Sequence, residues 1–118
     1  MTIHIEQLSF EAIIGILEFE RHTPQRIIID IQAHYNYDAN DNFFIDYAQL
    51  AELIKEIMVK GEFKLIESAL IALESQIIQK YSKIRELEIK ITKPDILNNC
   101  QVAVSKKWVY NNTTIGSS

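Results

Sequence analysis

The 118-residue sequence lacks several features that would mark an extracellular, membrane-bound or phosphate-binding protein. Its single cysteine, Cys100, excludes an internal disulfide and fits a reducing compartment, so we expect a cytoplasmic protein. The first residues, 1–6, already alternate like a strand, so we expect no signal peptide. No apolar run approaches the roughly 20 residues that a membrane-spanning helix needs, so no membrane association is expected. The three glycines are spread along the chain, which leaves no glycine-rich loop for a phosphate.

Basic clusters and metal motifs are also missing. The formal net charge is −4 and the lysines are scattered, which argues against binding to a nucleic acid. The histidines, His4, His22 and His34, lack the spacing of a metal motif, and one cysteine cannot complete a zinc site. We therefore expect no bound metal. A nucleophilic role for Cys100 stays open, although no neighbouring residue supports one.

The rest of the sequence has the composition of a folded domain. Hydrophobic residues make up 47% of the chain, enough for a core. We expect one domain over residues 1–110, followed by a polar tail over residues 111–118.

Two strands are predicted near the start. Residues 3–14 alternate apolar and polar in two separate stretches, which indicates one strand or a bent pair that ends at Gly15. Residues 25–37 alternate throughout, as expected for a strand with one buried face. Residues 16–24 between them are predicted to form a loop.

Two helices and two more strands follow. Asp46 is a candidate N-cap, with Gln49 completing a capping box, and Gly61 is expected at the C′ position of this helix. A second amphipathic helix is predicted to open within residues 63–70 and to run to about Tyr81. Alternation predicts strands over residues 86–92, stopped at Lys93-Pro94, and from 102 to about 108, with a loop over 95–101 between them.

The predicted order is β-β-α-α-β-β, an α+β arrangement. Two amphipathic helices can cover one face of a four-stranded antiparallel sheet. The edge strands of such a sheet would have unpaired backbone N–H and C=O groups. Closing the sheets of several subunits into a barrel would pair these groups.

Five polar residues stand at the ends of predicted elements, where a site could form: Glu20, His22, Tyr47, Glu67 and Lys93. Ordinary explanations exist for them. Glu20 would serve as a solvated loop charge, Tyr47 as a packing residue, and Lys93 as a strand-end charge. Glu67 lies in the first turn of a helix, where a carboxylate compensates the helix dipole. Position alone does not decide between these roles and a functional one.

Short segments, in fitting order and spacing over residues 3–108, resemble the dihydroneopterin aldolase family. They are the opening strand Ile5-Glu6-Gln7-Leu8, the loop Gly15-Ile16-Leu17-Glu18-Phe19-Glu20-Arg21, the helix starts Asp46-Tyr47-Ala48 and Leu65-Ile66-Glu67, and the strand end Ile89-Lys90-Ile91-Thr92-Lys93-Pro94.

The resemblance implies the tunnelling fold, a homo-oligomer (tetramer or octamer) with active sites between subunits, and retro-aldol cleavage of 7,8-dihydroneopterin. Glu67 would bind the pterin ring, with Leu65 and Ile66 beside it. Lys93 and Tyr47 would act as acid and base, Tyr47 coming from the neighbouring subunit and also contacting substrate. Glu20 would position Lys93. No cofactor or metal is implied, because the C=N bond of the dihydropterin accepts the electrons.

The sequence departs from the family at one loop. Residues 95–100 contain no glycine, and Ala103 stands where a glycine is common. Two alternatives stay open. One is an epimerase of dihydroneopterin or its triphosphate, for which the candidate cations are Arg21, Lys93, Lys106 and Lys107. The other is a non-catalytic pterin-binding oligomer.

Overall fold

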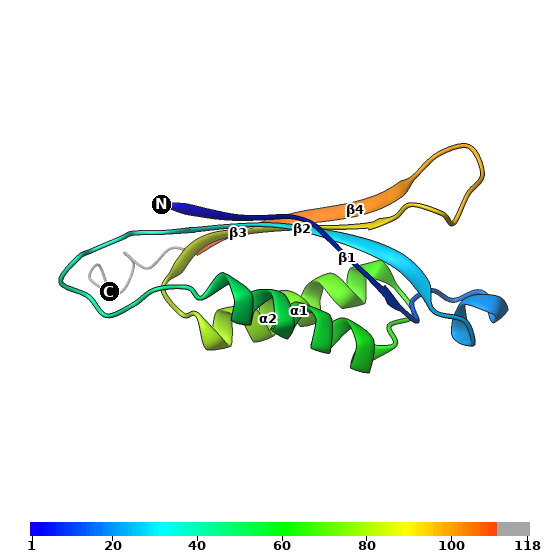
Figure 1. Cartoon of the computed structure of the whole chain (residues 1–118), viewed down its shortest axis with the longest axis horizontal. Helices are drawn as coiled ribbons and strands as arrows, with labels where there is room; N and C mark the ends of the chain where they lie inside the picture. Colours follow the sequence, from blue (N-terminus) through cyan, green and yellow to red (C-terminus); the bar gives the residue numbers. More distant parts are fainter. Residues whose placement is uncertain (111–118) are drawn as a thin grey trace.

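The computed structural model of the chain describes residues 1–110, and the predicted polar tail at 111–118 lies outside this range. The elements follow in the order β1 (Thr2–Ala12), the 3₁₀ turn η1 (Glu18–Arg21), β2 (Gln25–Tyr35), α1 (Tyr47–Gly61), α2 (Ile66–Lys80), β3 (Ile84–Lys93) and β4 (Val102–Val109). Figure 1 shows a twisted sheet with both helices beneath it. The predicted α+β class and β-β-α-α-β-β order are confirmed.

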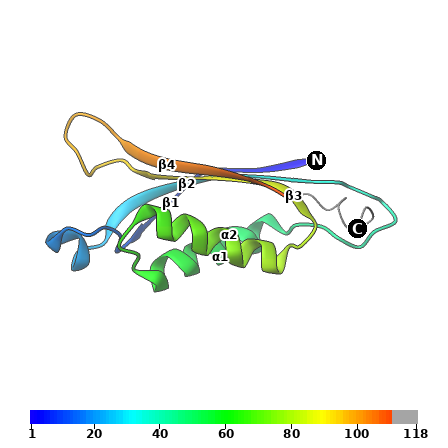
Figure 2. The ribbon, with the colours of Figure 1, turned by 180° about the vertical axis from the view of Figure 1, so that it is seen from behind.

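The four strands form one antiparallel sheet in the order β1-β2-β3-β4. Within residues 1–110, the outer edges of β1 and β4 pair with no further strand. The helices contact strands on the same side of the sheet, α1 against β1 and α2 against β3 and β4. Seen from behind, α2 is the nearer helix and again lies below the sheet (Figure 2).

Strand β1 contains a β-bulge that explains its two separate alternating stretches. Ile5 pairs with Ile31 and Leu8 pairs with Ile29, so β1 holds one extra residue between these pairs. Gln7 takes the left-handed conformation there, with φ of 58°, and its N–H donates to Asp30 Oδ1 at 2.9 Å. The two stretches thus belong to one bent strand rather than to two.

The core lies between the sheet and the helices. Along β2, Ile27, Ile29, Ile31 and Ala33 are buried, while the alternate residues face the other side. Each helix buries the apolar stripe that its sequence period predicts, and α2 does so with Ile66, Ala69, Leu70, Leu73 and Ile77. The opposite face of the sheet is largely polar, as a half-covered antiparallel sheet should be.

The predicted N-cap of α1 is confirmed, but its predicted C-terminus is wrong. Asp46 Oδ1 accepts hydrogen bonds from the N–H groups of Ala48 and Gln49. Gly61 is the last helical residue, and Glu62 takes the left-handed position, with φ of 44°. Gly61 is required for space instead, since a Cβ there would lie 2.2 Å from the ring of Phe63.

Other boundaries shift by a few residues. α2 begins at Ile66, after Leu65 as N-cap, so Phe63 stays outside the helix. β2 ends at Tyr35, β3 spans Ile84–Lys93, and the loop predicted over residues 16–24 contains the 3₁₀ turn. Among the described residues, no helix is both long enough and apolar enough to cross a membrane.

Candidate functional site

One end of the molecule brings together three backbone segments that are far apart in sequence. The β1–β2 connection with its 3₁₀ turn, the α1–α2 connection and the end of β3 meet here, beside the first residues of β2 (Figure 1). Glu20 comes from the 3₁₀ turn and Lys93 is the last residue of β3. The two residues are separated by 73 positions in the sequence.

Glu20 and Lys93 form a buried ion pair. Lys93 Nζ donates to Glu20 Oε2 at 2.8 Å, and the side chains are only 10% and 3% exposed, respectively. Together with Thr92, they are the only buried polar or charged residues in the described part of the chain. Buried charges cost solvation free energy, and an isolated pair of this kind is weak evidence of a purely stabilising role. Such a pair is therefore a candidate functional site.

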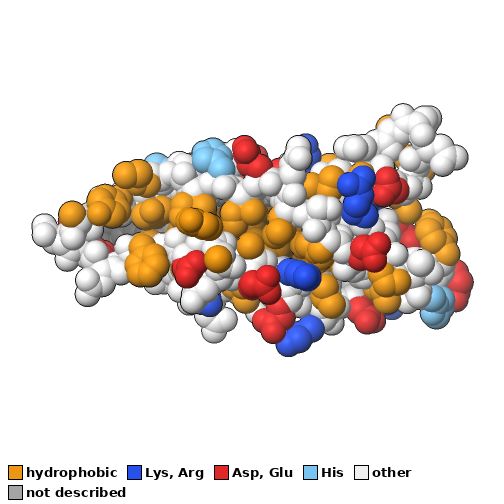
Figure 3. All heavy atoms as spheres, in the orientation of Figure 1, with side chains coloured by type: hydrophobic (Ala, Val, Ile, Leu, Met, Phe, Trp, Pro, Cys, Tyr) orange, Lys and Arg blue, Asp and Glu red, His pale blue; other side chains and the backbone are white. Residues whose placement is uncertain are grey.

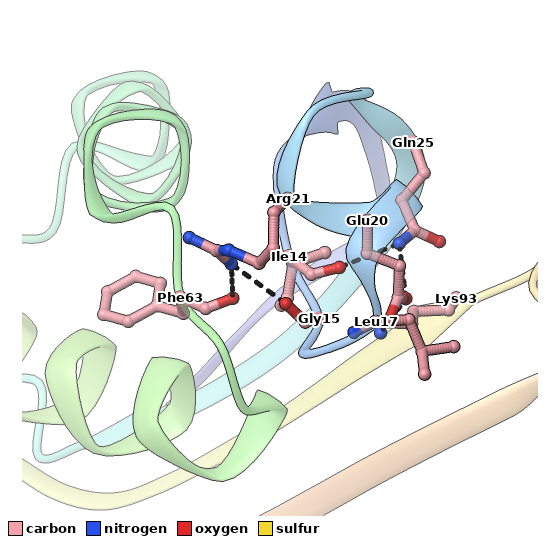
Figure 4. A network of polar contacts seen from close by, with 8 residues as sticks. All are labelled: Ile14, Gly15, Leu17, Glu20, Arg21, Gln25, Phe63 and Lys93. Carbon is pink, nitrogen blue, oxygen red and sulfur yellow. Dashed lines mark hydrogen bonds and ion pairs between the residues drawn. The ribbon is translucent and has the colours of Figure 1, made fainter.

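Two further contacts fix the orientation of the Glu20 carboxylate, and a third holds Gln25 in place. Oε2 also accepts a hydrogen bond from Gln25 Nε2 at 2.9 Å, and Oε1 accepts one from the Leu17 N–H at 3.2 Å. Gln25 Nε2 additionally donates to the carbonyl of Ile14 at 2.8 Å. Figure 4 shows Gln25, Leu17 and Lys93 converging on this carboxylate.

These contacts keep Glu20 ionised. Burial by itself would raise the pKa of Glu20, but the hydrogen bonds from Lys93, Gln25 and the Leu17 N–H, with the charge of Lys93, outweigh it. The net result is a pKa below the ordinary value of 4.5. Near neutral pH, Glu20 is therefore an anion that holds the Lys93 side chain in place. Among residues 1–110, Glu20 is the only hydrogen-bond partner of Lys93 Nζ, which leaves the other two N–H donors for a bound molecule.

Gly15 makes room for the carboxylate. Its φ is +130°, a conformation that residues with a Cβ rarely adopt, and a Cβ at this position would fall 2.1 Å from Glu20 Cδ. Glycine is therefore required at this position for two reasons: the backbone conformation and the space that the Glu20 side chain occupies.

The start of α2 lies beside this network. The Gly15 N–H donates to the carbonyl of Phe63 at 3.0 Å, which ties the β1–β2 connection to the segment that leads into α2. Leu65 and Glu67 are exposed, while Ile66 belongs to the core. Glu67 accepts no hydrogen bond from a side chain of the described residues, so its carboxylate faces solvent in the first turn of the helix.

Tyr47 does not join this group within one chain. It is the first residue of α1, whose last residue precedes the α1–α2 connection. Fifteen helical residues separate the two ends of α1 by about 21 Å. Tyr47 is 70% exposed and lies with Ala48 and Ala51 in a depression against Ile3 and Ile5. Figure 3, which faces β1 and α1, shows hydrophobic side chains gathered between the sheet and the helices.

His22 also stays outside the group. Its Nε2 lies 2.9 Å from Glu18 Oε2, and both side chains are largely exposed. Cys100 is exposed in the loop after β3. In the described part of the chain, no group of three or more histidine, cysteine, aspartate or glutamate side chains could hold a metal ion.

The cations considered for a triphosphate do not cluster. The guanidinium of Arg21 donates to three backbone carbonyls. Lys107 pairs with Glu86 at 3.2 Å, and Lys106 and Lys107 stand four and five residues along β4 from the partner of Lys93. Within residues 1–110, these cations thus form no concentrated positive charge beside Lys93.

Sequence reasoning missed Gln25, which appeared only as the first residue of a strand. Nothing in the alternation of β2 distinguishes it. A usable signal was its closeness to Pro24, which places Gln25 at the first position of the strand, where it pairs with Ala12.

Solved structures share this fold. The FolB protein of Vibrio cholerae aligns with a TM-score of 0.82 and 24% identity, over 93% of this chain and 98% of that one. Escherichia coli dihydroneopterin aldolase, solved with neopterin, aligns with a TM-score of 0.78 and 22% identity, over 92% and 98%. A urate oxidase of Bacillus sp. TB-90 aligns with a TM-score of 0.72 and 9% identity, over 92% of this chain and 47% of that one.

The fold is therefore the tunnelling fold, which dihydroneopterin aldolases and urate oxidases share. A search of curated protein sequences gave no match. The model of the FolB family, described as dihydroneopterin aldolase, matches residues 3–107. The chain belongs to the dihydroneopterin aldolase family, whose members are lyases.

Proposed function

We propose that this chain cleaves 7,8-dihydroneopterin into 6-hydroxymethyl-7,8-dihydropterin and glycolaldehyde, the aldolase step of folate biosynthesis. The observation that carries the proposal is the buried Glu20–Lys93 pair next to the start of α2, in a chain whose residues 3–107 match the aldolase family. The neopterin complex of the Escherichia coli enzyme supports a pterin as the ligand.

Glu67 is proposed to bind the pterin ring. Its exposed carboxylate can accept two parallel hydrogen bonds from a ring N–H and the adjacent amino group. Leu65, exposed beside it, and Ile66 would provide the neighbouring apolar and backbone contacts. The N–H groups in the first turn of α2 would stabilise the same carboxylate as an anion.

Lys93 and Tyr47 are proposed as the acid and base. Glu20 would hold the Lys93 ammonium through one hydrogen bond and leave its remaining donors directed to the substrate. Tyr47 would come from a neighbouring subunit, because it stands at the opposite end of α1 from the α1–α2 connection. This arrangement requires a homo-oligomer, and the unpaired edges of β1 and β4 are suitable contact surfaces.

The reaction is a retro-aldol cleavage. A base takes the proton from the hydroxyl on the second side-chain carbon, which becomes the carbonyl carbon of glycolaldehyde. The bond between the first and second side-chain carbons breaks, and its electron pair moves into the C=N bond of the dihydropterin ring. A general acid then protonates the first side-chain carbon to give the hydroxymethyl product. Positioned proton transfer of this kind contributes about 10²–10⁴-fold to the rate.

The test is the reaction itself. The purified wild-type protein is incubated with 7,8-dihydroneopterin in buffer containing a chelator, and both products are measured by chromatography. We expect equal amounts of glycolaldehyde and 6-hydroxymethyl-7,8-dihydropterin. An absence of glycolaldehyde at high enzyme concentration would refute the proposal. Recovery of a side-chain epimer without cleavage would favour the epimerase.

A further inference from the structure

The guanidinium of Arg21 connects two segments that carry different parts of the site. Its Nη1 donates to the carbonyls of Gly15 at 2.9 Å and Phe63 at 3.3 Å, and its Nη2 donates to the carbonyl of Glu62 at 2.8 Å. One acceptor belongs to the β1–β2 connection, and the other two belong to the connection between α1 and α2. Figure 4 shows Arg21 reaching from the 3₁₀ turn toward Phe63.

The 3₁₀ turn sends Glu20 and Arg21 in different directions. Successive residues of a 3₁₀ helix are rotated by about 120°. Glu20 therefore points to Lys93 at the end of β3, whereas its neighbour Arg21 points to the α1–α2 connection. A single turn of backbone thus contacts both the ion pair and the segment that leads into α2.

The α1–α2 connection has backbone features that make such a contact important. Glu62 is exposed and takes a left-handed conformation, with φ of 44°, which is unfavourable for a residue with a Cβ. α2 then begins only three residues after Phe63, with Leu65 as an N-cap that makes no side-chain cap hydrogen bond. Phe63 packs against the core and Ile66 is buried in it, and the hydrogen bonds from Arg21 and from the Gly15 N–H are the polar contacts that tie this segment to the β1–β2 connection.

We propose that Arg21 is a positioning residue that fixes the start of α2, with Leu65, Ile66 and Glu67, relative to the Glu20–Lys93 pair. This inference rests on the proposed function, in which α2 binds the pterin ring and Lys93 takes part in the chemistry. A planar guanidinium with five donors can bridge three carbonyls on two segments, whereas a lysine ammonium cannot reproduce that fork.

The expected effect is on turnover more than on affinity. Without the bridge, Glu67 can still bind the pterin, but the bound ring is displaced relative to Lys93. A displacement of about 1 Å at a reacting centre can reduce the rate 10²-fold. We therefore expect Arg21→Lys to lower kcat by about 10–100-fold while the Kd for neopterin changes by less than about threefold.

The experiment compares Arg21→Lys and Arg21→Ala with Arg26→Lys. Arg26 is a matched control, because it lies on β2 and, among residues 1–110, its side chain makes only an exposed ion pair with Asp95 at 3.4 Å. For each protein, kcat, KM, neopterin affinity and thermal stability are measured. Arg21→Ala is also assayed with and without millimolar methylguanidinium, using an equal concentration of sodium chloride as the reference.

A fall in kcat at nearly constant affinity, with partial recovery by methylguanidinium, supports the positioning role. The positioning role is overturned if folded Arg21→Lys keeps the wild-type kcat. It is also overturned if the loss of kcat in the variants follows only their loss of thermal stability.

Amide hydrogen exchange keeps the inference testable even if the wild-type protein does not cleave dihydroneopterin. In Arg21→Lys, residues 15–21 and 62–67 should lose protection together, whereas β4 should be unchanged. Unchanged protection in both segments would refute the link itself. If the wild-type protein does not cleave dihydroneopterin but both segments lose protection in Arg21→Lys, only the proposed function is refuted.

Discussion

Gly15 lies directly against the carboxylate of Glu20, close enough that a Cβ on Gly15 would be 2.1 Å from Glu20 Cδ. The glycine thereby determines where the carboxylate is placed, although it carries no functional group. This contact makes the Glu20–Lys93 pair sensitive to a change that adds only one methyl group.

Gly15→Ala should therefore inactivate the protein with a moderate loss of stability. Alanine is strained at a φ of +130°, which should lower the free energy of unfolding by about 1–3 kcal/mol. The displaced carboxylate should reduce kcat about 100-fold. Steady-state kinetics below the unfolding transition and urea denaturation measure the two effects. Near-wild-type activity would show that the placement of Glu20 does not matter.

The stability that Glu20 contributes should depend on pH in a defined direction. Its pKa is lowered in the folded protein, so this contribution is fully present above its unfolded pKa, near 4.5, and is lost as the pH falls through the lower folded value. The difference in unfolding free energy between wild type and Glu20→Gln should thus be constant above about pH 5 and shrink below it. Urea denaturation at several pH values tests this, and a difference that grows on acidification would contradict it.

Glu67→Ala should separate binding from folding. Glu67 is exposed and, within residues 1–110, makes no side-chain hydrogen bond, so its loss should cost less than about 1 kcal/mol of stability through the helix dipole. Neopterin affinity should fall at least 10-fold, because two charge-assisted hydrogen bonds are lost. Isothermal titration measures the affinity, and Ser68→Ala, an exposed neighbour in the same turn, is the control. Unchanged affinity would assign Glu67 to the helix dipole alone.

Lys93→Gln should abolish turnover and preserve pterin binding. The substitution leaves the Glu20 carboxylate buried without its cation, so Glu20→Gln/Lys93→Gln serves as a companion in which both side chains are neutral. Both variants should bind neopterin within about threefold of wild type and lose at least 100-fold in kcat. A variant that still releases glycolaldehyde at the wild-type rate would remove Lys93 from the reaction.

Tyr47 offers a direct test of sites shared between subunits. Glu20→Gln and Tyr47→Phe should each be inactive when pure. After the two proteins are mixed, dissociated and reassembled, random mixing should restore roughly a quarter of wild-type activity, because some sites then combine two intact halves. Activity that stays at the level of the parent variants would place all of the essential residues on one chain.

Much of the fold could be predicted, because alternation and the helical period directly report which side chains are buried. The stripe in α2 and the buried face of β2 are examples. The end of α1 was predicted wrongly, since a glycine near a helix end favours the C′ position. Here the ring of Phe63 occupies the space beside Gly61, and this contact is not visible in local sequence.

The candidate site was only partly accessible from the sequence. Glu20, Lys93 and Glu67 could be named through the family resemblance, but their distances could not, because Glu20 and Lys93 are 73 residues apart. The contacts made by Gln25 and Arg21 depend on where the chain turns after β1. α2 begins within the predicted range, at Ile66, and Phe63 lies before it because the Phe63 carbonyl accepts hydrogen bonds from Gly15 and Arg21 instead of from a helical N–H.

The length of α1 has a consequence for how the proposed assembly could change in evolution or design. Its 15 residues set the distance between Tyr47 and the α1–α2 connection. On each chain, the helix therefore fixes the distance between Tyr47, which would serve one active site, and the residues that would serve another. One inserted residue would move Tyr47 by about 1.5 Å and rotate it by about 100° without altering the Glu20–Lys93 pair. Exposed side chains of α1 away from Tyr47 can therefore vary without changing this spacing, whereas the number of residues in the helix cannot.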